Sequence, residues 1–211
     1  MSNFDIVTKL YSIPGIVVGL TLHECCHALA SYKLGDETAK SEGRLTLNPL
    51  KHIDPFGFIF ILFAGFGWAK PVSFREENLK RPRLYKALIA AAGPFSNLLL
   101  GLVLLIGLKL ALPLFVRTLP ETACAIIINL LLYAGIINLG LFAFNMLPLP
   151  PLDGSHIFLA GLHLKKETEA KIFRYGTLVL FTIIIIENAL NIDIIPIGKF
   201  TDWVFGLIFK Y

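Results

Sequence analysis

The chain has 211 residues, of which 55% are hydrophobic and 16% are charged, and its mean hydropathy is +0.71. Soluble domains carry about 25% charged residues, so the composition excludes an ordinary soluble protein and predicts a protein embedded in the lipid bilayer. In such a protein a net charge of +4 indicates basic cytoplasmic loops and no nucleic-acid partner. Three cysteines, two of them adjacent, do not make a disulfide framework.

The first predicted span covers residues 10–34 and contains the pattern H-E-x-x-H. His23 and His27 are four residues apart, so on a helix they lie on one face and both reach a single Zn²⁺. Two positions of the zinc tetrahedron remain for a third protein ligand and a water molecule. Glu24 is the expected general base on that water, whose pKa the metal lowers to about 7. The two cysteines inside the pattern are expected to be packing residues, although Cys26 could approach the metal.

The segment after this span is polar and basic. Apolar and polar residues alternate over residues 43–49, which predicts a short extended β-strand region associated with the membrane. Residues 55–68 are apolar, but about 14 residues are too few for a crossing helix, so a re-entrant or interfacial segment is favoured. Residues 69–86 form the densest basic loop of the chain, and the positive-inside rule places this loop in the cytoplasm.

Three further spans are predicted, over residues 87–112, 123–147 and 175–195. A short helix over 153–164 and a second basic loop precede the last span, and the tail after residue 198 is too short to cross the membrane and is expected to be interfacial. With both basic loops inside the cell, the first span ends in the cytoplasm, and His23 lies roughly 16 Å from that end. We expect one domain over residues 1–211, all-α with about four transmembrane helices, made of a catalytic core over about 10–164 and a C-terminal helix and tail over about 175–211.

The third zinc ligand must be ionisable and close to an apolar span on the same side of the membrane. Asp153 meets these conditions, and His156, three residues later on the same helical face, is the alternative. Asp153 could instead cap the N-terminus of the short helix. Asp36 and Glu37 follow the first span directly, and we expect both to be solvated.

Two asparagines within predicted spans need hydrogen-bond partners. Asn145 lies at the end of the third span and is a candidate donor to the oxyanion that forms when water attacks a peptide carbonyl. The alternative is a hydrogen bond that holds the proline-rich turn after it. Asn97 is a candidate substrate or oxyanion contact, and helix–helix packing is the slightly favoured alternative.

These residues together resemble the site-2 proteases, which are intramembrane zinc metalloproteases. The resemblance rests on four stretches of the sequence, which are residues 23–27, 43–55, 93–97 and 145–154. It is strongest where H-E-x-x-H is joined to N-x-x-P-x-x-P-L-D-G at this spacing. Because 211 residues leave no room for a PDZ or CBS-type domain, we expect a minimal bacterial-type member.

The resemblance implies a three-helix core in which His23, His27 and Asp153 hold one Zn²⁺ per chain and Glu24 acts as acid and base. It further implies that side chains around this centre position the substrate or stabilise the oxyanion. The segment over residues 43–49 would then pair with a locally unwound substrate helix. The residues expected to contact substrate are Asn97, Asn145, Gly43, Leu45 and Leu47.

The expected function is therefore hydrolysis of peptide bonds within or near transmembrane helices, as in regulated intramembrane proteolysis. The expected partner is a transmembrane protein, such as a membrane-bound anti-sigma-type regulator. The protein is expected in the cell membrane, with its active site towards the cytoplasm. The alternative is a membrane zinc-binding protein or zinc transporter, which would not depend on Glu24 and would have a second metal site along a path.

Overall fold

The computed structural model describes residues 6–64, 67–162, 164–190 and 192–210. Four of its helices are long and apolar enough to cross a membrane, and they are α1, α4, α5 and α7. This confirms the expected all-α polytopic architecture. The described part of the chain contains, in order, α1 (Ile6–Lys33), α2 (Thr38–Ser41), η1 (Pro49–Lys51), α3 (Pro55–Ala64), η2 (Glu76–Asn78), α4 (Pro82–Thr118), α5 (Glu121–Asn145), α6 (Asp153–Ala160), α7 (Lys166–Leu190) and α8 (Ile197–Phe209).

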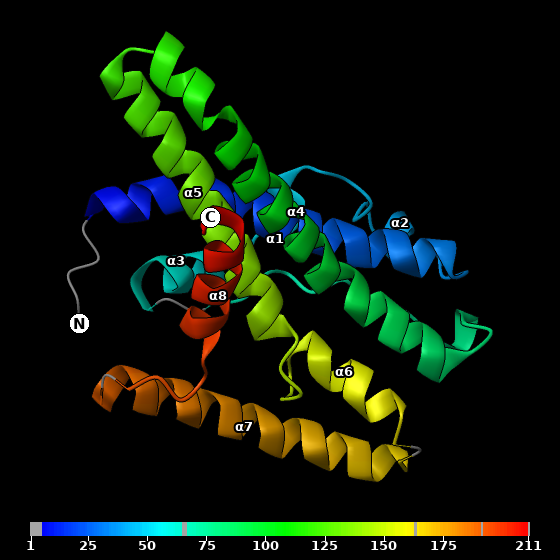
Figure 1. Ribbon diagram of the computed structural model, residues 1–211. Helices are drawn as coiled ribbons and strands as arrows, with labels where there is room; N and C mark the ends of the chain where they lie inside the picture. The colour runs from blue at the N-terminus through cyan, green and yellow to red at the C-terminus, as the bar shows by residue number, and fades with distance from the viewer. Residues whose placement is uncertain (1–5, 65–66, 163, 191, 211) are drawn as a thin grey trace.

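Helices α1, α4 and α5 form the centre of the molecule. Figure 1 shows α4 and α5 as an antiparallel pair that crosses α1. Glycines lie where these helices approach most closely: a Cβ atom added to Gly15 would lie 2.6 Å from the Cα atom of Ala134, and one added to Gly101 would lie 3.0 Å from the carbonyl oxygen of Gly135. Small residues let helix backbones come close together, which is how helices associate in lipid.

The long helix α4 begins earlier than the predicted span. It starts at Pro82, a residue that suits the first position of a helix because its φ angle is already helical and its missing N–H would have no partner there. With 37 residues it is roughly 55 Å long, which exceeds the hydrocarbon thickness of about 30 Å. The basic residues at its start, which the sequence placed in a loop, are therefore helical and carry Lys86 towards α7.

The C-terminal helices sit on the outside of this centre. Leu180 and Ile184 of α7 pack with Leu152, next to the start of α6, and Figure 1 shows α7 along the edge of the molecule beyond α6. The tail, expected to be interfacial, forms α8, whose Val204 packs with the fully buried Leu105 and Leu139 of α4 and α5. Residues 197–209 are therefore packed onto the helix pair.

The expected β-strand over residues 43–49 is wrong. The described residues contain no strand, and an isolated antiparallel bridge joins Ile53 to Ala69 instead. Over residues 43–49 the backbone groups find local partners: the N–H of Arg44 donates to the carbonyl of Ala39 at 2.9 Å, and the ring of His52 bonds the carbonyl of Thr46 at 2.7 Å. Alternation predicts which way side chains point, but a strand also needs a neighbouring strand, and this segment has none in the described part.

The apolar segment over residues 55–68 contains a short helix, and the residues that flank it are joined to each other. Helix α3 has ten residues, and residues 65–66 lie outside the described part. The two ends of the segment meet, because the N–H of Lys70 donates to the carbonyl of His52 at 2.7 Å. The guanidinium of Arg44 holds the same junction through the carbonyls of Lys51, Lys70 and Pro71. Whether this segment is re-entrant or interfacial stays a prediction from the sequence.

Candidate metal centre

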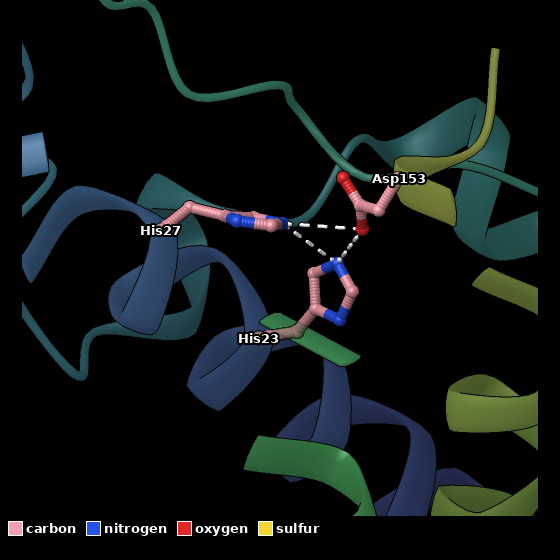
Figure 2. Close-up of side chains that lie close together, drawn as sticks. All are labelled: His23, His27 and Asp153. Carbon is pink, nitrogen blue, oxygen red and sulfur yellow. Dashed lines mark hydrogen bonds and ion pairs between the residues drawn. The ribbon is translucent and has the colours of Figure 1, made fainter. Parts of the chain in front are cut away.

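The centre begins with the two histidines on one face of α1. His23 and His27 are both buried, and their Nε2 atoms lie 3.0 Å apart. A helix places residues four apart one above the other, so this proximity follows from the local sequence alone. The rings meet edge to face, with centroids 4.6 Å apart, and both Nε2 atoms point to a common position (Figure 2).

Asp153 is brought to the same position from the first residue of α6. Its Oδ2 atom lies 3.1 Å from Nε2 of His23 and 3.3 Å from Nε2 of His27, as the dashed lines in Figure 2 show. The N-cap of α6 is Leu152, and no side-chain hydrogen bond caps the helix. Asp153 therefore does not cap the N-terminus of α6, which was the alternative role for this residue.

The three side chains fit a catalytic zinc ion. Their ligand atoms all lie within 4.8 Å of one another, and two imidazole nitrogens with one carboxylate oxygen leave the fourth position of a tetrahedron open. Gly93 of α4 keeps the space beside them free: a Cβ atom there would overlap the His27 ring and lie 2.7 Å from Nε2 of His23. Gly93 belongs to the motif over residues 93–97, but the motif alone does not indicate that this glycine keeps space free beside the histidines.

Each histidine is oriented by the partner of its other ring nitrogen. Nδ1 of His27 lies 2.7 Å from the carbonyl oxygen of Ile89, and because a carbonyl can only accept, Nδ1 carries the proton. Nδ1 of His23 lies 2.6 Å from Oδ1 of Asn97. A proton on each Nδ1 leaves the lone pair of each Nε2 free for a metal, and such outer partners also fix the ring orientation.

Glu24 and His156, the other ionisable residues near the centre, lie outside the cluster of ligand atoms. Glu24 is buried, with 8% of its surface exposed, and its carboxylate makes no hydrogen bond with any residue that the structure describes. His156 packs on the ring of Phe173, with centroids 4.7 Å apart, and lines a cavity between α4, α6 and α7 with Lys86 and Glu169.

The two asparagines that are expected to contact substrate have different hydrogen-bond partners. Asn97 is fully buried, and its amide nitrogen donates to the Gly19 carbonyl at 3.0 Å and to Oδ1 of Asn138 at 2.9 Å. Both of its donors are engaged, which favours the packing alternative. The amide of Asn145 donates to the Leu141 carbonyl at 3.0 Å.

The segment that carries Gly43, Leu45 and Leu47 contributes no ligand atom to the metal cluster, and Leu47 is 67% exposed. Sequence reasoning did not single out Asn138, although an asparagine in an apolar span is itself a signal, because its polar side chain needs a partner there. The structure therefore assembles His23, His27, Asp153 and Asn97. Residues 43–49 contribute no ligand to this group, although the backbone of Thr46 interacts with Cys25 of α1.

Comparison with known proteins agrees with this arrangement. The model of peptidase family M50 matches residues 108–186, a stretch that includes Asp153. The protein named "Putative zinc metalloprotease YwhC" of Bacillus subtilis is 40% identical over 200 residues, which cover 92% of this chain and 84% of the relative. Rip2 of Mycolicibacterium smegmatis is 29% identical over 207 residues, covering 94% and 71%.

A third relative, MJ0611 of Methanocaldococcus jannaschii, is 32% identical over 162 residues, covering 74% of this chain and 72% of the relative. Its name, like those of the other two, describes a zinc metalloprotease. No solved structure matches the chain. The identity and coverage of the first relative, together with four apolar helices, show that this multi-pass membrane protein belongs to peptidase family M50, the site-2 protease family of zinc metalloproteases.

Proposed function

We propose that this protein hydrolyses peptide bonds within or near transmembrane helices of membrane-protein substrates, with one zinc ion per chain held by His23, His27 and Asp153. The observation that carries the proposal is the convergence of these three side chains inside a bundle of apolar helices. Ionisable groups within a membrane span are costly and mark functional sites. A family of zinc metalloproteases supplies the reaction class, and the membrane supplies the substrate class.

The catalytic steps follow from the side chains. Zinc bound between the three ligands supplies Lewis-acid chemistry towards water and towards a peptide carbonyl. Glu24 takes a proton from the attacking water and delivers it to the departing nitrogen, a role for which its carboxylate is not held by a hydrogen bond to any described residue. Asn145 has one amide proton beyond its bond to Leu141, and this proton is the proposed donor to the oxyanion.

Substrate and water reach the centre from different surroundings. A helix in lipid keeps its peptide groups in hydrogen bonds, so the substrate must unwind locally before its carbonyl is attacked. The exposed segment with Gly43, Leu45 and Leu47 is the proposed surface against which the unwound chain lies. Water is proposed to enter from the cavity lined by Lys86 and His156, beside α6.

The two basic loops support a site on the cytoplasmic side of the cell membrane. In this setting the proposed substrate is a single-pass regulator, such as an anti-sigma-type protein, released by regulated intramembrane proteolysis. The transporter alternative requires a second metal site along a path. Among the described residues, the group of His23, His27 and Asp153 alone has the geometry of a metal site, which favours the protease.

The decisive test replaces the proposed base. Glu24→Gln in the full-length protein, purified in detergent, should retain zinc and lose cleavage of a transmembrane reporter by at least about 100-fold, since general base catalysis contributes about 10²–10⁴. Glu37→Gln is the matched control, because the Glu37 side chain is 73% exposed and lies beyond α1. Normal cleavage by Glu24→Gln would exclude the proposed mechanism.

A further inference from the structure

A buried hydrogen-bond chain connects the metal centre to α5. It begins at Asn138, a fully buried polar residue inside an apolar helix. The amide nitrogen of Asn138 donates to the carbonyls of Ala134 at 2.8 Å and Gly15 at 3.3 Å. Its Oδ1 atom accepts from the amide nitrogen of Asn97 at 2.9 Å, and Oδ1 of Asn97 lies 2.6 Å from Nδ1 of His23.

The direction of every bond in this chain is determined by backbone carbonyls. A carbonyl oxygen can only accept, so Ala134 and Gly15 force the nitrogen of Asn138 towards them and its oxygen towards Asn97. That oxygen, with the carbonyl of Gly19, forces the nitrogen of Asn97 to face away from the metal centre. The oxygen of Asn97 is then presented to His23, whose Nδ1 must carry the proton.

We propose that Asn138 is a positioning residue of the metal centre, which acts through Asn97 to hold His23 in the tautomer and ring orientation that direct the Nε2 lone pair to the metal. If the amide of Asn97 were reversed, its N–H groups would face Nδ1 of His23, and the proton would move to Nε2, which then could not bind zinc. The inference rests on the proposed zinc centre and adds a residue one step further from the ion.

The packing of α1 on α5 is built around this chain. A Cβ atom added to Gly19 would lie 2.6 Å from Oδ1 of Asn138, so glycine at this position gives the asparagine its room. Each of the helices α1, α4 and α5 contributes a residue to the chain, so the position of the His23 ring is tied to the crossing of all three. A buried amide without a hydrogen-bond partner would be costly, so the two asparagine side chains are expected to keep these orientations.

The test measures zinc binding by the full chain in detergent, by competition with a chelator and without substrate. Asn138→Leu should weaken zinc binding by about 10–100-fold and change the visible absorption spectrum of the cobalt-substituted protein. Asn129→Leu is the matched control in the same helix, since the amide of Asn129 donates to Ala125 within α5. It should change neither property.

A double variant shows whether Asn138 acts through Asn97. If it does, Asn97→Leu/Asn138→Leu should bind zinc as weakly as Asn97→Leu alone, whereas independent effects would add. The thermal unfolding of the metal-free proteins separates positioning from general loss of structure. Should Asn138→Leu not fold, Asn138→Ala removes the donors to Ala134 and Gly15 and the acceptor for Asn97 without added bulk, and should weaken binding in the same direction.

Equal zinc affinity of the Asn138 and Asn129 variants, or additive losses in the double variant, would overturn the proposal. Zinc binding without peptide cleavage would instead contradict the proposed protease function and leave the positioning role intact. Failure of the unaltered protein to bind zinc would overturn both.

Discussion

Oδ2 of Asp153 lies 3.1 Å from Nε2 of His23, although the two residues belong to different helices and are far apart in the sequence. The contact exists because the chain turns back after α5 and begins α6 with Asp153 itself. His156, one helical turn later, faces Phe173 of α7 instead. The two candidates for the third ligand are therefore distinguished by position, since both have suitable chemistry.

Replacing Asp153 should abolish zinc binding, whereas replacing His156 should not. Asp153→Ala removes a charged ligand from a three-ligand centre, and we expect zinc affinity to fall by at least about 100-fold, the upper range of losses for outer partners of a metal. His156→Ala is the control and should stay within a few-fold of the unaltered protein. Zinc content after dialysis decides between them, and the opposite ranking would assign the ligand to His156.

Gly93→Ala should disturb the centre without altering any ligand. Its Cβ atom would overlap the His27 ring, so the imidazoles must move apart, and we expect lower zinc occupancy and at least a tenfold lower cleavage rate, since small displacements in an active site are costly. Gly107→Ala is the matched control in α4, because a Cβ atom there has no neighbour within 4 Å. Unchanged zinc binding by Gly93→Ala would show that the space beside the histidines is not needed.

Asp36 should stabilise the fold in a pH-dependent manner. Its position directly after the first span predicts a solvated side chain, but Asp36 is fully buried. Burial opposes its ionisation, yet hydrogen bonds from Asn78, Thr38 and the Arg75 backbone outweigh burial and lower its pKa to about 2. These bonds attach the segment before α4 to the end of α1.

A pKa lowered by folding means that the stabilisation is complete above the unfolded pKa of about 4 and is lost as the pH falls towards 2. Asp36→Asn should therefore reduce the free energy of unfolding by about 2 kcal/mol at pH 7, and the difference from the unaltered protein should disappear as the pH falls through about 2. Glu37→Gln, at an exposed neighbouring position, should have no such effect. Thermal unfolding in detergent across this pH range provides the measurement, and a pH-independent difference would contradict the assignment.

Lys86 should attach α7 to the core. Its Nζ atom lies 2.8 Å from Glu169 of α7 and 3.2 Å from Glu76 of η2. Two partly exposed ion pairs together contribute about 1 kcal/mol, so Lys86→Met should speed amide hydrogen exchange over the first turns of α7 roughly fivefold. The exposed Lys80 provides the control variant Lys80→Met, which should leave the exchange unchanged. Equal exchange in both variants would mean that apolar packing alone holds α7.

Local sequence patterns are sufficient to predict the class of protein and half of the metal centre. Apolar stretches of sufficient length predict the spans because lipid cannot pair backbone groups, and the described residues include four such helices. The spacing of His23 and His27 predicts their proximity because a helix repeats every 3.6 residues. Both properties depend on residues within a single helix, so neither requires contacts with distant parts of the chain.

Contacts between residues of different helices follow from the tertiary structure and could not be read from local patterns. In the folded chain Asp153, and not His156, lies next to the two histidines, and Asn97 is the partner of the His23 ring. The structure also shows no strand over residues 43–49 in the described part, because a strand needs a partner that periodicity cannot supply. The crossing of α1, α4 and α5 is set by close contacts at glycines, such as Gly19 against Asn138, and only that crossing brings distant polar side chains within hydrogen-bond reach.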